Sequence, residues 1–323
     1  MKNLPKITVG ICVFNGMKYL RETLESLRNQ TFTNYEIFVV DDASSDGSAE
    51  FIFSYMSDFC LVKIHRLEEN CGLAYARNTL LNLVETKYLV FLDSDDVPMP
   101  SLLERLCVKV CSDESLMAVG CYHKYIDSNS KVMSGGLFVG PRSHSEFIEK
   151  SEKGKFIFLQ PTAIIDREYA LKAGGMRLDG FSIEGPRYRD LCEDLDLWCR
   201  MSDFHREGKA ILVIPEILSH YRKHNQALSK NTFGMLLRMA HIKQNLKERR
   251  SGRSETCFEQ FFASMNKDKL KEVEMEAKGI DVFRRFYYSL TKGHIFPALL
   301  SFSVGVISNP KYLYDKILNR FSL

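Results

Sequence analysis

The sequence lacks any apolar run long enough to cross a membrane. A membrane-spanning helix needs about 20 consecutive apolar residues. The nearest approach, residues 295–307, is shorter and contains Pro297 and Gly305. Residues 1–6 lead directly into a strand-like segment and do not resemble a secretory leader. We therefore expect a cytoplasmic protein without a transmembrane segment, or one held peripherally on the inner face of the plasma membrane.

No Cys-x-x-Cys pair occurs among the nine cysteines, which lie at scattered positions. Such pairs are typical of zinc sites and redox motifs, and a regular framework of cysteines is typical of small secreted domains. Cys12 falls within an apolar, strand-like segment, as expected for a thiol that serves as a small hydrophobic side chain. We expect reduced cysteines in a cytosolic protein rather than a zinc or disulfide scaffold.

Two phosphate-binding patterns are also missing: the G-x-G-x-x-G fingerprint of dinucleotide-binding folds and the G-x-x-x-x-G-K-[ST] phosphate loop. Their absence disfavours NAD-dependent redox chemistry and P-loop ATP chemistry. The chain has no internal repeat and no low-complexity linker. Its 323 residues, 45% of them hydrophobic and 26% charged, are ordinary for a globular protein that buries a sizeable core.

The net charge of +3 conceals an asymmetry along the chain. Residues 1–237 carry 28 basic and 32 acidic residues, whereas residues 238–323 carry 16 basic and 9 acidic ones. We expect a catalytic domain over residues 1–230 and a helical, basic region over residues 231–323. Aromatic and basic residues interleave over residues 282–323, so this part is expected either to lie on an anionic membrane surface or to cap the domain. Nucleic acid is not an expected partner, because no recognition motif is present.

Buried-strand patterns alternate with helical ones in the first part of the chain. The expected strands are residues 7–14, 36–40, 61–67 and 87–92, and the expected helices are residues 17–29 and 73–84. This order is typical of an α/β fold with a Rossmann-like, mostly parallel sheet flanked by helices. Later expectations are a helix from Pro98 and Pro100 to Cys111, strands over 116–121, 156–165 and 210–214, a helix over 193–202, and helices from about Thr232.

The most informative segment is the apolar run of residues 88–92, which ends in Asp93-Ser94-Asp95-Asp96. Three carboxylates within four positions repel one another unless a cation lies between them. Taken alone, the pattern also fits an ordinary turn, because Asp and Ser bond their own backbone there. In open α/β sheets, however, the carboxyl ends of the strands are where ligands bind.

Other polar residues end neighbouring strands of the expected sheet. Asn15 follows the first strand, and Asp41 and Asp42 follow the second. One crevice would then hold several carboxylates and the basic side chain of Arg77. A nucleoside diphosphate explains this set, since carboxylates accept hydrogen bonds from a base or ribose and a hard cation bridges oxygen ligands to phosphate.

In their order and spacing, these segments resemble the inverting glycosyltransferases of family 2, which have the GT-A fold. The matching segments are Phe14-Asn15, residues 26–31, 36–48, 70–78 and 91–96, Gly174-Gly175, and residues 193–200 and 221–224. The resemblance covers roughly residues 5–230. It implies a UDP-sugar donor, a DXD motif at residues 93–95, and Mn²⁺ or Mg²⁺ as cofactor.

The resemblance also implies roles for individual residues of the donor site. Asp41 or Asp42 should contact the uracil or ribose. The nucleoside pocket should be lined by Phe14 and Asn15, Arg77 should lie near the base and phosphates, and Asp93 should face the ribose. Asp95 should bind the metal beside the diphosphate, and His224 is a second candidate for the metal or diphosphate.

For the chemical step, the resemblance implies Asp194 as general base with Glu193 beside it. Inversion needs one base to take the acceptor proton while the sugar–phosphate bond breaks on the opposite face, and a carboxylate can do this. The alternative is that these acids merely favour the start of a helix. The nearest other enzyme class is a nucleotidyltransferase, and a non-catalytic nucleotide-sugar-binding protein is a third possibility.

One feature departs from the family pattern, and others concern the acceptor. Cys12-Val13 stands where such sequences usually carry a proline. The stretch 177–192 is long and basic, and we expect Arg187 and Arg189 to help bind an anionic acceptor. Trp198 could stack on an acceptor sugar, but its helical spacing with Leu195 favours a core position. The expected acceptor is a glycan or lipid-linked oligosaccharide of a bacterial surface polysaccharide or lipopolysaccharide pathway.

Overall fold

The structure is a computed structural model that describes residues 4–55, 61–160, 162–180, 187–224 and 228–291. Its contacts divide the chain into two compact units. The first comprises residues 1–178 and 192–224, and the second comprises residues 179–191 and 225–323. The sequence-based division after residue 230 assigns 179–191 to the first unit, whereas the fold groups them with the second.

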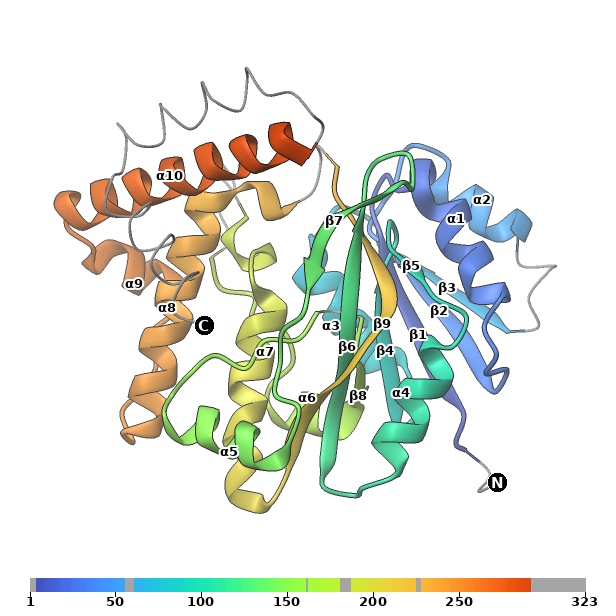
Figure 1. The fold of residues 1–323 in the computed structure, drawn as a ribbon, viewed down its shortest axis with the longest axis horizontal. Helices are drawn as coiled ribbons and strands as arrows, with labels where there is room; N and C mark the ends of the chain where they lie inside the picture. The colour runs from blue at the N-terminus through green and yellow to red at the C-terminus, as the bar shows by residue number, and fades with distance from the viewer. Residues whose placement is uncertain (1–3, 56–60, 161, 181–186, 225–227, 292–323) are drawn as a thin grey trace. The chain divides into compact units, whose positions relative to one another are not determined.

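The first unit begins with four parallel strands in the spatial order β3-β2-β1-β4 (Figure 1). Their bounds are Ile7–Val13 (β1), Tyr35–Asp41 (β2), Val62–Arg66 (β3) and Tyr88–Asp93 (β4). The helices between them are Met17–Arg28 (α1), Ser48–Tyr55 (α2) and Leu73–Leu83 (α3). The expected alternation is confirmed, and the expected bounds differ from the observed ones by at most one residue at each end.

β1 and β4 are central strands, which explains their uninterrupted apolar sequences. Ile7, Val9 and Ile11 are completely buried. α3 packs on β1 and β2, and Gly10 makes this close approach possible. A side chain at Gly10 would lie 2.9 Å from Leu80 of α3, a distance that real β-carbons do not reach.

The rest of the sheet is mixed, and continues from β4 in the order β8-β6-β9-β5, with β7 paired to β6. These strands span Val97–Pro98 (β5), Leu116–Ile126 (β6), Val132–Leu137 (β7), Ile164–Asp166 (β8) and Ala210–Arg222 (β9). β6 and β9 are parallel, and β8 runs antiparallel to both β4 and β6. The expected strand at 210–214 is longer than predicted, because the pairing resumes beyond Pro215 after a register shift between Cys121 and Tyr122.

The expected strand over residues 156–165 is wrong for most of its length, since β8 begins only at Ile164. Ile157 and Leu159 are nevertheless buried. The alternating apolar side chains therefore fill the core without joining the sheet. Gly120 of β6 leaves the space that Leu159 occupies, since a side chain at Gly120 would lie 2.3 Å from it.

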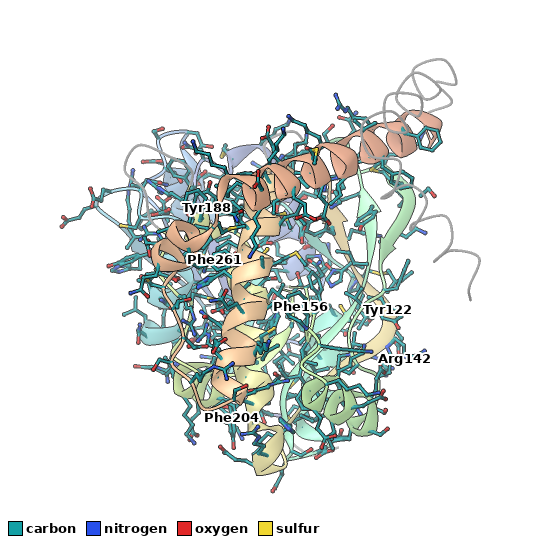
Figure 2. The ribbon with its side chains drawn as sticks, turned by 90° about the vertical axis from the view of Figure 1, so that its left-hand side faces the viewer. Tyr122, Arg142, Phe156, Tyr188, Phe204 and Phe261 are labelled. Atoms are coloured by element: carbon teal, nitrogen blue, oxygen red, sulfur yellow. The ribbon has the colours of Figure 1, made fainter. Side chains whose placement is uncertain are left out.

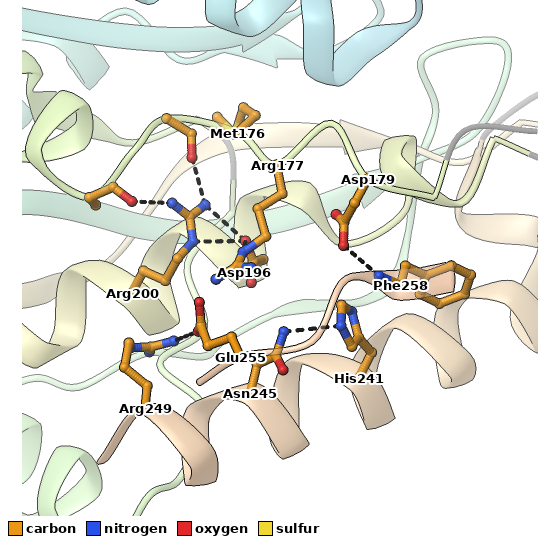
Figure 3. A network of polar contacts seen from close by, with 12 residues as sticks. Met176, Arg177, Asp179, Asp196, Arg200, His241, Asn245, Arg249, Glu255 and Phe258 are labelled. Atoms are coloured by element: carbon orange, nitrogen blue, oxygen red, sulfur yellow. Dashed lines mark hydrogen bonds and ion pairs between the residues drawn. The ribbon is translucent and has the colours of Figure 1, made fainter. Parts of the chain in front are cut away.

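Four helices complete the first unit among its described residues: Leu102–Cys111 (α4), His144–Glu152 (α5), Arg167–Lys172 (α6) and Glu193–Met201 (α7). α4 packs on β6 and β9. α7 is tied to the segment after α6 by Arg200, which donates hydrogen bonds to Asp196 (2.9 Å) and to the carbonyls of Ala173 and Gly175 (Figure 3). After α7, Phe204 packs on Tyr169 with ring centroids 5.3 Å apart (Figure 2).

The second unit contains Thr232–Arg250 (α8), Phe258–Ser264 (α9) and Lys267–Thr291 (α10). Leu237, Phe258 and Phe261 form its small core. Asp179 joins this unit because it accepts a hydrogen bond from the Phe258 amide (2.7 Å; Figure 3). The helical character expected after about Thr232 is confirmed for residues 232–250, 258–264 and 267–291. The basic, aromatic tail expected over 282–323 lies mostly outside the described residues.

Within the described residues, no helix is both long and apolar enough to span a bilayer. The eight cysteines described by the structure carry free thiols.

Candidate active site

The exit of β1 is bound to the loop after β2 by the Asn15 backbone and side chain. The Asn15 amide donates to the Ser44 hydroxyl (3.0 Å), and the Asn15 side-chain oxygen accepts from the Ser45 amide (2.8 Å). Asn15 has a positive φ of 51°, a conformation that asparagine tolerates better than most residues. Phe14, directly before it, is 51% exposed. An aromatic ring therefore faces solvent at the carboxyl edge of the sheet, where the sequence predicted a nucleoside pocket.

Asp41 and Asp42 are both buried but differ in what their carboxylates do. Asp42 accepts hydrogen bonds from the Asn70 side chain (3.0 Å) and from the amides of Cys71 (2.7 Å) and Gly72 (2.8 Å). It therefore fixes the start of α3. Asp41 accepts one bond through Oδ1, from the Ser44 amide (3.1 Å).

The second oxygen of Asp41, Oδ2, is buried and receives no hydrogen bond within the described residues. Its nearest cation is Arg66, whose Nε lies 3.5 Å away. A buried acceptor without a donor is costly. Of the two aspartates, Asp41 therefore has a carboxylate oxygen whose hydrogen-bonding capacity the described residues do not use.

Arg77 of α3 lies buried between two acidic segments that are far apart in the sequence. Its Nη2 donates to Asp93 Oδ1 at the end of β4 (2.6 Å), and its Nη1 donates to Glu193 Oε1 at the start of α7. The guanidinium also lies over the ring of Phe91, 5.5 Å from its centroid. One arginine thus holds the expected donor-site carboxylate and the expected catalytic segment together.

Arg77 is surrounded by more carboxylates than its single positive charge can neutralise. Burial raises the pKa of Glu193 to about 8, and the neighbouring Asp194 and Asp93 charges act in the same direction, while Arg77 opposes the shift. Burial also raises the pKa of Asp93 and of Asp194. The nearby acids raise the pKa of Arg77 against the effect of its burial, so the guanidinium stays charged. The cluster therefore retains a proton near neutral pH.

Glu193 and Asp194 begin α7 but face different surroundings. Glu193 is buried, and its carboxylate is engaged by Arg77. Asp194 is partly exposed, and its Oδ1 accepts from the Leu195 amide (2.8 Å), as acids at a helix start commonly do. Of the two, Asp194 has the more accessible carboxylate.

Asp95 and His224 come together at the other end of the acidic loop. His224 Nε2 lies 2.7 Å from Asp95 Oδ2, and neither side chain is fully buried. Between them and the core, Asp96 accepts a hydrogen bond from the Arg222 amide (2.9 Å). Burial and the adjacent acids Asp95 and Asp93 raise the pKa of Asp96 well above its usual value.

The Asp95 carboxylate is the kind of oxygen ligand that Mn²⁺ or Mg²⁺ prefers, and His224 Nε2 lies at hydrogen-bonding distance beside it. The described residues contain no group of three or more His, Cys, Asp or Glu side chains placed to hold a metal ion. Such an ion would therefore need further ligands from outside the protein, such as phosphate oxygens or water.

The three expected acceptor residues fall in different parts of the fold. Trp198 is 1% exposed within the core of the first unit, so it offers no face to a sugar, and its alternative interpretation as a core residue is confirmed. Arg187 and Arg189 belong to the second unit.

Sequence reasoning missed the role of Arg222, which is completely buried beside the acidic loop. The sequence feature that could have pointed to Arg222 is a charged residue at the end of an apolar strand. It also did not predict that Asp42 is used to build the loop before α3.

Comparisons with known proteins identify the family and the fold. The family model described as glycosyl transferase family 2 matches residues 8–174. A putative teichuronic acid biosynthesis glycosyltransferase, TuaG of Bacillus subtilis, is 24% identical over 276 residues, which cover 82% of this chain and 98% of TuaG. Glycosyltransferase GlyA of Streptococcus pneumoniae is 42% identical over 125 residues, which cover 38% of this chain. The match spans only 18% of GlyA, and another match spans 41% of the pneumococcal glycosyltransferase GlyG.

Solved structures share the fold. S. aureus TarS 1–349 in complex with UDP-GlcNAc superposes with a TM-score of 0.56 at 18% identity, covering 91% of this chain and 89% of TarS 1–349. The mannosyltransferase PcManGT of Pyrobaculum calidifontis, in complex with GDP-Man and Mn²⁺, gives a TM-score of 0.54 at 16% identity, covering 98% of this chain and 89% of PcManGT. The expected α/β fold of the GT-A type is confirmed.

Proposed function

The chain belongs to glycosyl transferase family 2, and on this premise we propose that it transfers one sugar from a UDP-sugar to a hydroxyl of a glycan acceptor. The transfer is metal-dependent and inverts the anomeric centre. The observation that carries this proposal is the edge of the sheet itself. It places a buried, unsatisfied acceptor on Asp41 at one strand end and the Asp95–His224 pair at another.

In this proposal the donor lies along that edge. The Asp41 Oδ2 accepts a hydrogen bond from the uracil or ribose, and Phe14 and Asn15 border the nucleoside. Asp93 faces the ribose through the oxygen that Arg77 leaves available. Asp95 and His224 would hold Mn²⁺ or Mg²⁺, and such an ion would supply positive charge beside the leaving diphosphate.

Asp194 is the proposed general base, because it is the accessible carboxylate at the start of α7. It takes the proton from the acceptor hydroxyl as the sugar–phosphate bond breaks. Glu193 is held by Arg77 and supports the position of Asp194 rather than meeting the acceptor. Arg77 then links the donor-binding end of β4 to the catalytic end of α7, instead of contacting the phosphates directly.

The acceptor is proposed to be a glycan or lipid-linked oligosaccharide made for a bacterial cell surface. The name of TuaG refers to teichuronic acid biosynthesis, and a role in polysaccharide biosynthesis supports such an acceptor. Arg187 and Arg189 are proposed to bind anionic groups of the acceptor. The basic C-terminal region supports association with the inner face of the plasma membrane, since residues 238–323 carry 16 basic and 9 acidic residues.

The proposal is tested by UDP release from a panel of UDP-sugars with Mn²⁺ and without acceptor. Slow release from one donor, abolished by EDTA and by Asp95→Ala, is the expected result. A nucleotidyltransferase would release no UDP from these donors, and would release pyrophosphate when given UTP and a sugar 1-phosphate. A non-catalytic binding protein would bind UDP, release nothing, and be indifferent to Asp194→Asn. Either of these results would overturn the proposal.

A further inference from the structure

Arg222 ends β9 two residues before His224, and its side chain is completely buried. A buried arginine is costly unless its donors are satisfied. Here they are distributed over several partners. Nε donates to the Asp95 carbonyl (2.7 Å), Nη1 to the Asp127 carbonyl (3.1 Å) and the Ser130 hydroxyl (2.9 Å), and Nη2 to Glu22 (2.6 Å).

These partners come from three separate parts of the first unit. Asp95 belongs to the acidic loop after β4. Asp127 and Ser130 form the turn between β6 and β7, and Glu22 lies on α1. Ser130 also donates to Glu22 (2.7 Å), so the turn and the helix are bonded to each other as well as to the guanidinium. Arg222 is thus the common partner of three segments that are distant in sequence.

The same residue also supports the His224 side of the site. The Arg222 guanidinium lies over the ring of Tyr19, 4.5 Å from its centroid. The His224 ring also lies beside the Tyr19 ring, with centroids 5.2 Å apart. The backbone amide of Arg222 donates to Asp96 (2.9 Å). Through these contacts, Arg222 restrains both Asp95 and His224, whose side chains meet at 2.7 Å.

We propose that Arg222 is a positioning residue for the metal–diphosphate end of the donor site, anchored by Glu22 and the β6–β7 turn. The inference rests on the proposed function. It means that Arg222 holds the metal–diphosphate end of the donor site in place, independently of the nucleoside end at Asp41. Lysine cannot replace Arg222, because one ammonium group cannot donate in the four directions that the planar guanidinium serves.

The test compares two ligands in each variant by calorimetry: UDP with Mn²⁺, and UMP with EDTA as a probe of the nucleoside end alone. Arg222→Lys should weaken Mn²⁺-dependent UDP binding by about 10- to 100-fold, as outer-shell changes at metal sites do. UMP binding should stay within about twofold of wild type.

Arg200→Lys is the matched control. Arg200 is also buried, and it donates to Asp196 and to the carbonyls of Ala173 and Gly175, which are not among the residues assigned to the donor site. Both variants should lower the midpoint of thermal unfolding, but Arg200→Lys should leave both binding constants unchanged. A purely structural role for Arg222 would make the two variants behave alike.

Equal losses of UDP and UMP binding in Arg222→Lys, or no loss in either, would overturn the inference. If Arg222→Lys does not unfold cooperatively, Glu22→Gln combined with Ser130→Ala replaces it, because this pair removes the anchor and keeps the guanidinium. Selective loss of UDP–Mn²⁺ binding then supports the inference, and unchanged binding refutes it. Failure of the wild type to bind UDP with Mn²⁺ would instead refute the proposed function.

Discussion

Replacing Arg77 by methionine should destabilise the first unit, and the loss should grow with pH. Methionine keeps most of the side-chain length but removes the guanidinium that binds Asp93 and Glu193. Arg77 is 2% exposed, so water cannot take its place without opening the packing around α3. The two carboxylates, with Asp194 nearby, would then face one another without a counter-charge.

Breaking a buried ion pair by removing one partner costs about 3–5 kcal/mol. Protonation relieves part of this cost, and the sign follows from the pKa values. Burial raises the pKa of Glu193 from 4.5 to about 8, so the folded protein holds a proton that the unfolded chain releases. The contribution of Glu193 to the free energy of unfolding therefore falls as the pH rises from about 4.5 to about 8. Without Arg77 the pKa values of Glu193 and Asp93 should rise further. The decrease in the free energy of unfolding with rising pH should then become steeper and extend to higher pH.

The assay is urea unfolding followed by the fluorescence of Trp198, the single tryptophan. Trp198 is buried in α7, so its signal reports on the first unit. Arg77→Met should lose about 3–5 kcal/mol at about pH 8.5 and clearly less at about pH 5.5. The double variant Arg77→Met with Glu193→Gln should recover part of the loss at the higher pH, because it removes one uncompensated carboxylate.

An equal loss at both pH values would show that Arg77 contributes packing rather than charge compensation. A double variant less stable than Arg77→Met alone at high pH would contradict the assigned pairing with Glu193.

Three further predictions concern the proposed ligands. Asp194→Asn should lower kcat by about 10²–10⁴-fold, the usual contribution of a general base, and leave UDP binding by calorimetry unchanged; unchanged kcat would exclude Asp194 as the base. Asp41→Asn should weaken UMP binding in EDTA by about tenfold, because an amide that presents its NH₂ cannot accept the ligand's hydrogen bond; full UMP affinity in a folded variant would assign the nucleoside elsewhere. Arg187→Gln with Arg189→Gln should raise the KM for an anionic acceptor and spare donor binding, and equal loss of both would count against an acceptor role.

The strands that carry the site could be predicted from the sequence because they are buried on both faces. Their apolar runs, such as residues 88–92, have no polar alternation and end abruptly in acids. β9 was predicted too short because Pro215 removes a backbone donor and reads as the end of a strand. Residues 156–163 were predicted as strand because of apolar residues such as Ile157 and Leu159, but these side chains pack in the core, and β8 begins only at Ile164.

Part of the candidate site was predictable for the same reason. Parallel strands end at one edge, so Asn15, Asp41 and Asp95 could be assigned to it from strand order alone. The pairing of Arg77 with Glu193 could not, since 116 residues separate them and no local pattern links α3 to α7. The sequence also does not reveal that the Asp42 carboxylate accepts hydrogen bonds from the amides of Cys71 and Gly72. By contrast, Oδ2 of Asp41 receives no hydrogen bond from the described residues.

We propose that this edge binds a nucleoside diphosphate together with a metal ion held by Asp95 and His224. The most direct measurement is calorimetric titration of the wild type and of Asp95→Ala with UDP, each in Mn²⁺ and in EDTA. We expect Mn²⁺ to strengthen UDP binding to the wild type by about tenfold or more. Mn²⁺ should have no effect on UDP binding to Asp95→Ala, and the affinity of this variant for UDP should equal that of the wild type in EDTA. UDP binding that is equally tight with and without Mn²⁺, or a Mn²⁺ effect that survives in Asp95→Ala, would contradict this proposal.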